Sequence, residues 1–171
     1  MKTKFLSILL LLVIAAPGQS KLPTFEDYPT KLFRGRLHYP AWIKRVTRNE
    51  WRDNLGKLVS SPSVDFAGKY FVAVHSLGTG ARYYSMTDLS SGRELGDLDR
   101  FATAEPTLKL RDGRDFLTVI YTRPQSRLIV AQYLIDYMLK PDPECHERSF
   151  VLENGKIRPL TKISMRCRKF Q

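Results

Sequence analysis

Short runs of aromatic and β-branched residues follow one another from Lys69 to the end of the chain, and turn-forming residues separate them. Runs of this kind are typical of β-strands. Asn154-Gly155, between two of the runs, is a strong signal for a two-residue hairpin. The pattern predicts strands over residues 69–75, 81–89, 115–122, 127–135, 149–152 and 156–160, with residues 163–167 as a candidate last strand.

Within residues 81–89, successive side chains are expected on opposite faces of a sheet, because the side-chain period of a strand is two. One face then carries Tyr83, Ser85, Thr87 and Leu89, and the other carries Tyr84, Met86 and Asp88. Six or seven short strands at this spacing, joined by tight turns, predict an antiparallel arrangement.

Residues 21–40 are expected to form an extended arm, because Pro23, Pro29 and Pro40 restrict helix formation. The aromatic side chains of the arm would pin it to the domain; they are Phe25, Tyr28, Phe33 and Tyr39.

Residues 40–59 are the best helical candidate. Thr47 with Glu50 has the spacing of a capping box, which predicts that the helix starts near Thr47. Trp51, Leu55 and Leu58 follow at positions i, i+4 and i+7 and would share one apolar face. The predicted fold class is therefore α+β: mainly an antiparallel β meander or small sandwich, with an N-terminal arm, one helix and one disulfide.

The first twenty residues have the layout of a secretory signal peptide. Lys2 and Lys4 precede an apolar run from Phe5 to Ala16, and Pro17-Gly18-Gln19-Ser20 ends it. The run is shorter than the roughly twenty residues of a membrane span, so we expect no transmembrane anchor. Cleavage is expected after Ser20, which leaves a single β-rich domain over residues 21–171, exported to the periplasm or the medium.

Cys145 and Cys167 are the two cysteines of the chain. An exported protein with two cysteines usually pairs them, so a structural disulfide is expected. The bridge would stabilise the fold by about 3 kcal/mol. A redox or metal pair is the alternative, but no CxxC is present, and the three histidines lack metal-ligand spacing. We expect no metal and no cofactor.

The chain is strongly basic, with a net charge of +11 and a pI near 9.8. Without Lys2 and Lys4, 26 Lys and Arg remain against 17 Asp and Glu, which leaves +9. Such a charge attracts anionic partners, although a solvated basic surface without a ligand is the alternative. The candidate anion- or partner-binding residues fall in two blocks: Arg34, Arg36, Lys44, Arg45, Arg48 and Arg52 in the first, and Arg166, Arg168 and Lys169 in the second.

Four segments together resemble a group of small secreted proteins of Gram-negative bacteria. They are Phe25-Glu26-Asp27-Tyr28-Pro29, Asp65-Phe66-Ala67-Gly68-Lys69-Tyr70, Thr87-Asp88-Leu89-Ser90-Ser91-Gly92-Arg93 and Ser126-Arg127-Leu128-Ile129-Val130. The resemblance implies an envelope location and a β-rich fold, and it implies no activity. Members of the group usually have two cysteines in the turn after the first strand, and residues 76–82 of this chain contain neither.

Catalytic motifs are weak in this sequence. The turn with Gly78, Thr79, Gly80 and Arg82 is a candidate loop, but it lacks the Gly-Lys-Ser/Thr ending of a phosphate loop, so a hairpin connection is favoured. His75 stands beside Ser76, yet neighbouring residues of a strand point to opposite faces, and no GxSxG elbow is present. A nucleophile–base pair would need a partner from elsewhere in the chain.

These observations favour an exported, non-catalytic binding protein that recognises a macromolecular partner in the bacterial envelope. An inhibitor or immunity-type protein against an acidic envelope protein is one concrete version. The first alternative is a binder of anionic envelope polymers or lipids. The second is a hydrolase whose site is assembled from distant residues, including His75. We expect no nucleic-acid partner.

Overall fold

The computed structural model describes residues 21–170 apart from 79–80, 97, 103–109, 111 and 140. Ten β-strands and two short 3-10 turns are present in this part of the chain, with no α-helix. All strand pairs within the sheets are antiparallel. The predicted antiparallel β fold is confirmed, and the helix of the predicted α+β class is not.

The largest sheet has four strands in the order β10-β9-β8-β7. Asn154 and Gly155 join two of them with φ angles of +50° and +75°, as a two-residue hairpin turn with two positive φ angles requires. The strands are β7 (Phe116–Tyr121), β8 (Leu128–Ile135), β9 (Glu144–Glu153) and β10 (Lys156–Pro159). The predicted strands are confirmed here, although β9 begins at Glu144 and not at residue 149.

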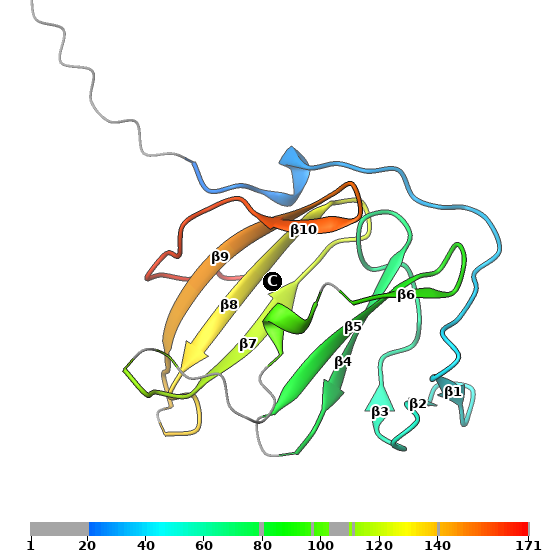
Figure 1. Cartoon of the computed structure of the whole chain (residues 1–171), viewed down its shortest axis with the longest axis horizontal. Coiled ribbons are helices and arrows are strands. Elements are labelled where there is room, and N and C mark those ends of the chain that lie inside the picture. Colours follow the sequence, from blue (N-terminus) through cyan, green and yellow to red (C-terminus); the bar gives the residue numbers. More distant parts are fainter. Residues whose placement is uncertain are drawn as a thin grey trace, which may run out of the picture.

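The second sheet contains β4 (Tyr70–Ser76), β5 (Arg82–Asp88) and β6 (Arg93–Leu95). β4 and β5 pair along their whole length, with His75 opposite Tyr83 and Ala73 opposite Ser85. The two sheets lie side by side (Figure 1), and Tyr84 of β5 donates a hydrogen bond of 2.7 Å to the carbonyl of Thr118 in β7.

Alternate residues of both sheets form the main core, because side chains on successive positions of a strand point to opposite faces. Tyr84 and Met86, which were predicted to share one face of their strand, both belong to this core. The 3-10 turn η2 (Asp99–Phe101) adds Phe101, which meets Phe150 edge-on. The other buried members are Phe66, Ala67, Tyr70, Val72, Leu98, Ile129, Ala131, Leu152 and Ile157.

The predicted helix over residues 40–59 is wrong. This segment forms a small three-stranded sheet of β1 (Lys44–Arg45), β2 (Trp51–Arg52) and β3 (Leu58–Val59). Leu55 and Leu58, which would have lain on the apolar face of the helix, are 60% and 65% exposed.

Local hydrogen bonds and a second core explain this outcome. The backbone N–H of Val46 donates to the carbonyl of Glu50 at 2.9 Å, so residues 46–50 form a turn where the capping box was expected. Trp42, Trp51 and Val59 pack against a buried cluster of Ile43, Phe71, Ala73 and Leu89, on the far side of β4 from the main core. Packing of large apolar side chains on β4 therefore outweighs the helical spacing.

The arm over residues 24–38 lies largely extended and contains one 3-10 turn, η1 (Phe25–Asp27). Its backbone N–H groups donate to carbonyls of the body: Thr30 to Gln125 (2.9 Å), Phe33 to Gly68 (2.7 Å) and His38 to Leu89 (2.8 Å). Gly68 has a φ of +82°, and an added Cβ would lie 2.1 Å from the carbonyl oxygen of Lys31. Only glycine permits this approach of the arm.

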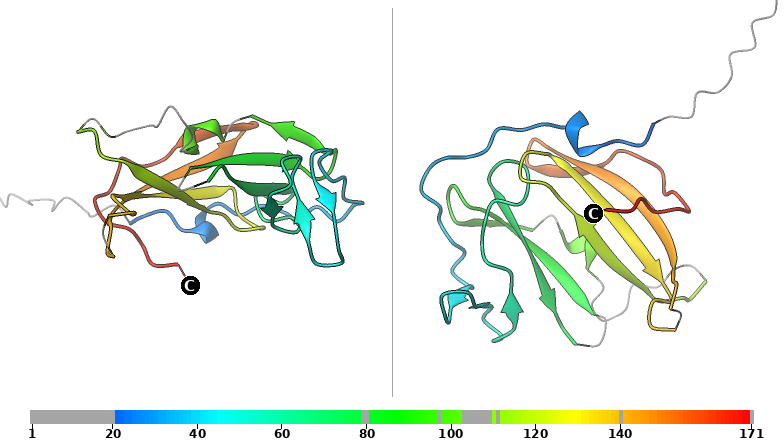
Figure 2. Two further views of the ribbon diagram at one scale, coloured as in Figure 1. Left: turned by 90° about the horizontal axis from the view of Figure 1, so that it is seen from below. Right: turned by 180° about the vertical axis from the view of Figure 1, so that it is seen from behind.

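The C-terminal tail after β10 crosses the large sheet, as Figure 2 shows from behind. The predicted strand over residues 163–167 is wrong, since only an isolated bridge between Glu147 and Ser164 forms there. Cys145 of β9 and Cys167 of the tail form the predicted disulfide. No helix within the described residues is long and apolar enough to cross a membrane.

Candidate functional site

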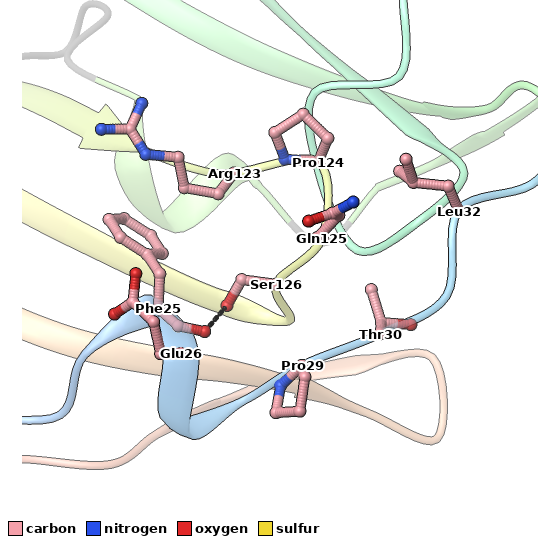
Figure 3. A pocket seen from close by; sticks show the side chains of 9 residues that line it. All are labelled: Phe25, Glu26, Pro29, Thr30, Leu32, Arg123, Pro124, Gln125 and Ser126. Atoms are coloured by element: carbon pink, nitrogen blue, oxygen red, sulfur yellow. Dashed lines mark hydrogen bonds between the residues drawn. The ribbon is translucent and has the colours of Figure 1, made fainter.

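An open groove of about 620 Å³ lies between the N-terminal arm and the β7–β8 turn (Figure 3). The arm contributes Phe25, Glu26, Pro29, Thr30 and Leu32, and the turn contributes Arg123, Pro124, Gln125 and Ser126. Figure 3 shows Phe25 and Arg123 towards one end and Leu32 towards the other. The groove therefore combines apolar walls with polar groups at its margin.

Ser126 holds the two walls together. Its hydroxyl donates to the carbonyl of Phe25 at 2.8 Å and accepts from the backbone N–H of Leu128 at 3.1 Å (Figure 3 shows the first of these bonds). The side chain is buried, and the neighbouring N–H of Arg127 donates to the carbonyl of Tyr28 at 2.9 Å. These bonds fix the shape of the groove before any ligand arrives.

A cation and a carboxylate line the same end of the groove (Figure 3). The Arg123 guanidinium lies 5.5 Å from the ring centroid of Phe25, within the range of a cation–π contact. Glu26 is exposed on the same wall as Phe25. A ligand at this end meets an aromatic ring, a cation and a carboxylate.

A second site lies on β4 and β5, beneath the small sheet. His75 of β4 has one ring nitrogen, Nδ1, 3.2 Å from Asp53 Oδ2, and the other, Nε2, 2.8 Å from Ser85 Oγ. The side chains of His75 and Asp53 are 4% and 1% exposed. Three residues separated in sequence therefore form a buried Asp–His–Ser line of hydrogen bonds.

Asp53 is positioned by its own loop. Its Oδ1 accepts the backbone N–H groups of Leu55 and Lys57, each at 2.9 Å. Burial raises the pKa of the Asp53 carboxyl, but the hydrogen bonds from Lys57, His75 and Leu55 outweigh burial and hold it below its usual value. Asp53 is therefore ionised at neutral pH and can only accept a hydrogen bond from His75.

A small pocket of about 240 Å³ opens on this line of residues. Besides His75 and Ser85 it is lined by Trp42, Asn54, Tyr83 and Glu94. The His75 ring stacks on Tyr83 with centroids 4.3 Å apart and meets Trp42 edge-on at 4.7 Å. These two rings fix the plane of the imidazole.

In the first basic block, two arginine side chains hydrogen-bond within the turns of the small sheet, and four cationic side chains are exposed. Arg45 donates to the carbonyls of Thr47 and Arg48, and Arg52 donates to Glu50 and to the carbonyl of Gly56. The side chains of the other four make no hydrogen bond or ion pair within the described residues; they are Arg34, Arg36, Lys44 and Arg48.

The second block is also divided. Arg168 pairs with buried Glu147, so its charge is used inside the protein, whereas Arg166 and Lys169 are exposed. Figure 2 shows β1–β3 and the C-terminal tail towards opposite ends of the molecule. The two basic blocks therefore do not converge on one site.

The candidate loop is a hairpin connection where it is described. The N–H of Leu77 donates to the carbonyl of Ala81 at 2.9 Å, Gly78 has a φ of +124°, and Arg82 begins β5. Thr79, Gly80 and the predicted signal peptide over residues 1–20 lie outside the described residues. Among the residues that the structure covers, no cluster of three or more His, Cys, Asp or Glu side chains could hold a metal ion.

No family model matches this chain, and neither a curated protein nor a solved structure matches it. What the fold defines is a disulfide-bonded, antiparallel β domain with a groove on one part of its surface and an Asp–His–Ser line on another.

The sequence pointed to His75 but to neither of its partners, Asp53 and Ser85. Ser85 was placed on the same strand face as Tyr83, and the register of β4 and β5 would have brought that face next to His75. Nothing in the sequence indicated that Asp53 would reach His75, because Asp53 lies within the segment predicted to be helical. The groove was missed because its walls come from segments about one hundred residues apart.

Proposed function

We propose that this protein is an exported binding protein that takes a short segment of a protein partner into the groove between the N-terminal arm and the β7–β8 turn. The observation that supports this proposal is the groove itself, a preformed hollow with apolar walls and charged margins. The leader-like first twenty residues and the Cys145–Cys167 disulfide support export, because disulfides persist in oxidising compartments.

The groove has the size and composition of a recognition site. Its volume of about 620 Å³ is within the range of roughly 300–1,000 Å³ that is typical of ligand pockets. Phe25, Pro29, Leu32 and Pro124 offer apolar contact, and Arg123 can pair with a carboxylate of the bound segment.

The walls are already held in place, which favours binding. The Ser126 bond to Phe25 and the Thr30 bond to Gln125 join the arm to the turn. A groove that is ordered before binding loses little conformational entropy when the partner arrives. The net positive charge adds attraction at long range, so an acidic envelope protein is the favoured partner, in the manner of an inhibitor or immunity-type protein.

The test compares two charge insertions in the protein of residues 21–171. Leu32→Asp places a carboxylate inside the groove, and Leu139→Asp places the same change at a turn residue that is 81% exposed and outside it. Both variants and the wild type are immobilised and exposed to envelope extract at low and high salt. We expect the wild type and Leu139→Asp each to retain one acidic protein in stoichiometric amount. Leu32→Asp should not retain it. Equal retention by Leu32→Asp, or no retained protein on the wild type, would contradict the proposal.

A second candidate function is the binding of anionic polymers or lipids by the first basic block. The observation that favours it is the proximity of Lys44 and Arg48, both exposed, to Val46, whose side chain is 56% exposed. Cations beside apolar side chains suit a surface of anionic headgroups and hydrocarbon. Lys44→Glu with Arg48→Glu should abolish sedimentation with phosphatidylglycerol vesicles. Arg166→Glu with Lys169→Glu, at the other end of the molecule, is the matched control and should leave sedimentation unchanged.

A further inference from the structure

The hydrogen bonds of His75 show which of its two ring nitrogens carries the hydrogen. Ionised Asp53 can only accept, so the Nδ1 nitrogen of His75, 3.2 Å from Asp53 Oδ2, carries the hydrogen. Nε2 is then the basic nitrogen, and it lies 2.8 Å from Ser85 Oγ, where it accepts the hydroxyl proton. A hydroxyl, an imidazole and an orienting carboxylate in this order are the parts of an activated nucleophile.

The Ser85 hydroxyl belongs to a residue that lines a pocket in which a small substrate can bind. Ser85 is half-buried and lines the hollow of about 240 Å³ together with His75. Two other lining residues carry N–H donors, the carboxamide of Asn54 and the indole of Trp42. The buried indole nitrogen makes no hydrogen bond within the described residues. The carboxamide of Asn54 is exposed, so its N–H is available to a negatively charged oxygen in the pocket.

We propose that Ser85 is a catalytic nucleophile, with His75 as its general base and Asp53 as a positioning residue, and that it hydrolyses small carboxylic esters. This activity goes beyond binding in the groove and uses a different part of the molecule. The pocket volume limits the acyl group to a few carbons. Glu94 lines the same pocket, so uncharged or cationic esters are favoured over anionic ones.

The reaction balances with water as the only other reactant. Ser85 Oγ forms a bond to the ester carbonyl carbon while its proton passes to His75 Nε2, and the carbonyl π electrons move to oxygen. Collapse of this intermediate breaks the bond to the alkoxy oxygen, which leaves as the alcohol with the proton from His75. Water then attacks the acyl-Ser85 and gives its proton to His75. The carboxylic acid departs, and Ser85 regains its hydrogen.

The test is covalent labelling of the oxidised protein of residues 21–171 with a fluorophosphonate. This reagent phosphonylates an activated serine with loss of fluoride, and peptide mass spectrometry locates the adduct. We expect one adduct, on Ser85, and a labelling rate that falls by at least about 100-fold in His75→Gln and to zero in Ser85→Ala. Ser61→Ala, an exposed serine outside the pocket, is the matched control and should label like the wild type.

Turnover gives a second readout. The wild type should hydrolyse p-nitrophenyl acetate with an initial burst of one nitrophenolate per protein molecule. Asp53→Asn should lower the rate of this burst, and thermal unfolding should show that the variant is still folded. Asn54→Ala changes an exposed residue and should slow the burst without altering stability. Absence of any adduct on wild-type Ser85, or equal labelling of wild type and folded His75→Gln, would overturn the proposal.

Discussion

The guanidinium of Arg168 donates a hydrogen bond of 2.6 Å to the carboxylate of Glu147, whose side chain is only 2% exposed. The backbone N–H of Arg168 donates to the other oxygen of this carboxylate at 2.9 Å, and the carboxamide of Gln132 donates to the same oxygen at 3.0 Å. Further guanidinium donors reach the hydroxyl of Ser149 and the carbonyl of Pro23. One arginine thus ties the tail, the large sheet and the N-terminal arm together.

Removal of Arg168 should therefore destabilise the fold, and should not act as the loss of a surface cation. Arg168→Met leaves Glu147 buried without its partner, and we expect a loss of about 3 kcal/mol in the free energy of unfolding. The double variant Arg168→Met with Glu147→Gln should recover part of this loss, because no buried charge remains. Urea unfolding at neutral pH measures both values. A loss below about 0.5 kcal/mol in Arg168→Met, the range of surface changes, would contradict the structural role.

The disulfide should contribute measurably to stability. Cys145 and Cys167 are 22 residues apart in sequence, and their bridge fixes the tail on β9. Reduction should lower the free energy of unfolding by about 3 kcal/mol, because the unfolded chain gains conformational freedom. Urea unfolding with and without reductant measures the difference. Cys145→Ser with Cys167→Ser is the control, and it should match the reduced wild type and not respond to reductant.

Asp65 should make stability fall with rising pH. Burial raises the pKa of its carboxyl to about 7, despite the hydrogen bond from the backbone N–H of Val72 at 2.9 Å. From about pH 4, the ordinary pKa of Asp, up to about 7, the folded state keeps a proton that the unfolded state has lost. This contribution to stability is full below pH 4 and is lost as the pH rises through 7.

The replacement Asp65→Asn should remove this slope, because the amide does not ionise and its oxygen can still accept from Val72. At pH 8 the variant should exceed the wild type by about 1 kcal/mol or more in the free energy of unfolding, whereas the two should converge near pH 4. Thermal unfolding from pH 4 to 8 measures the difference. Asp142→Asn, a change at an exposed carboxyl, should follow the wild type. Parallel curves for Asp65→Asn and the wild type would be incompatible with this role.

Gly68 should be required for attachment of the arm. Gly68→Ala combines a φ of +82° with a Cβ 2.1 Å from the carbonyl oxygen of Lys31. Gly155→Ala is the matched control, since its φ is +75° but nothing lies within 4 Å of an added Cβ. We expect a loss of about 1 kcal/mol for Gly155→Ala and about 3 kcal/mol for Gly68→Ala. Proteolysis of the arm should accelerate in Gly68→Ala alone, and equal effects of the two variants would refute the role of the contact.

The sequence by itself determined the long strands of the two larger sheets and the disulfide. Residues 82–88 alternate between two faces, and Asn154-Gly155 can adopt two positive φ angles that most residues resist, so both features are encoded locally. The two cysteines had one possible pairing within the chain, and the structure confirms it.

Only the tertiary structure decided which secondary structure residues 40–59 adopt and which residues come together in the two sites. Trp42 and Trp51 gain more by packing against β4 than the segment gains from helical spacing, and nothing in the local sequence reveals that competition. His75 meets Asp53 and Ser85 because β4 pairs with β5 and the loop after β2 folds over them, and Phe25 meets Ser126 because the arm crosses the β7–β8 turn. Such contacts depend on long-range register and on shared burial, which are properties of the whole chain and not of any one segment.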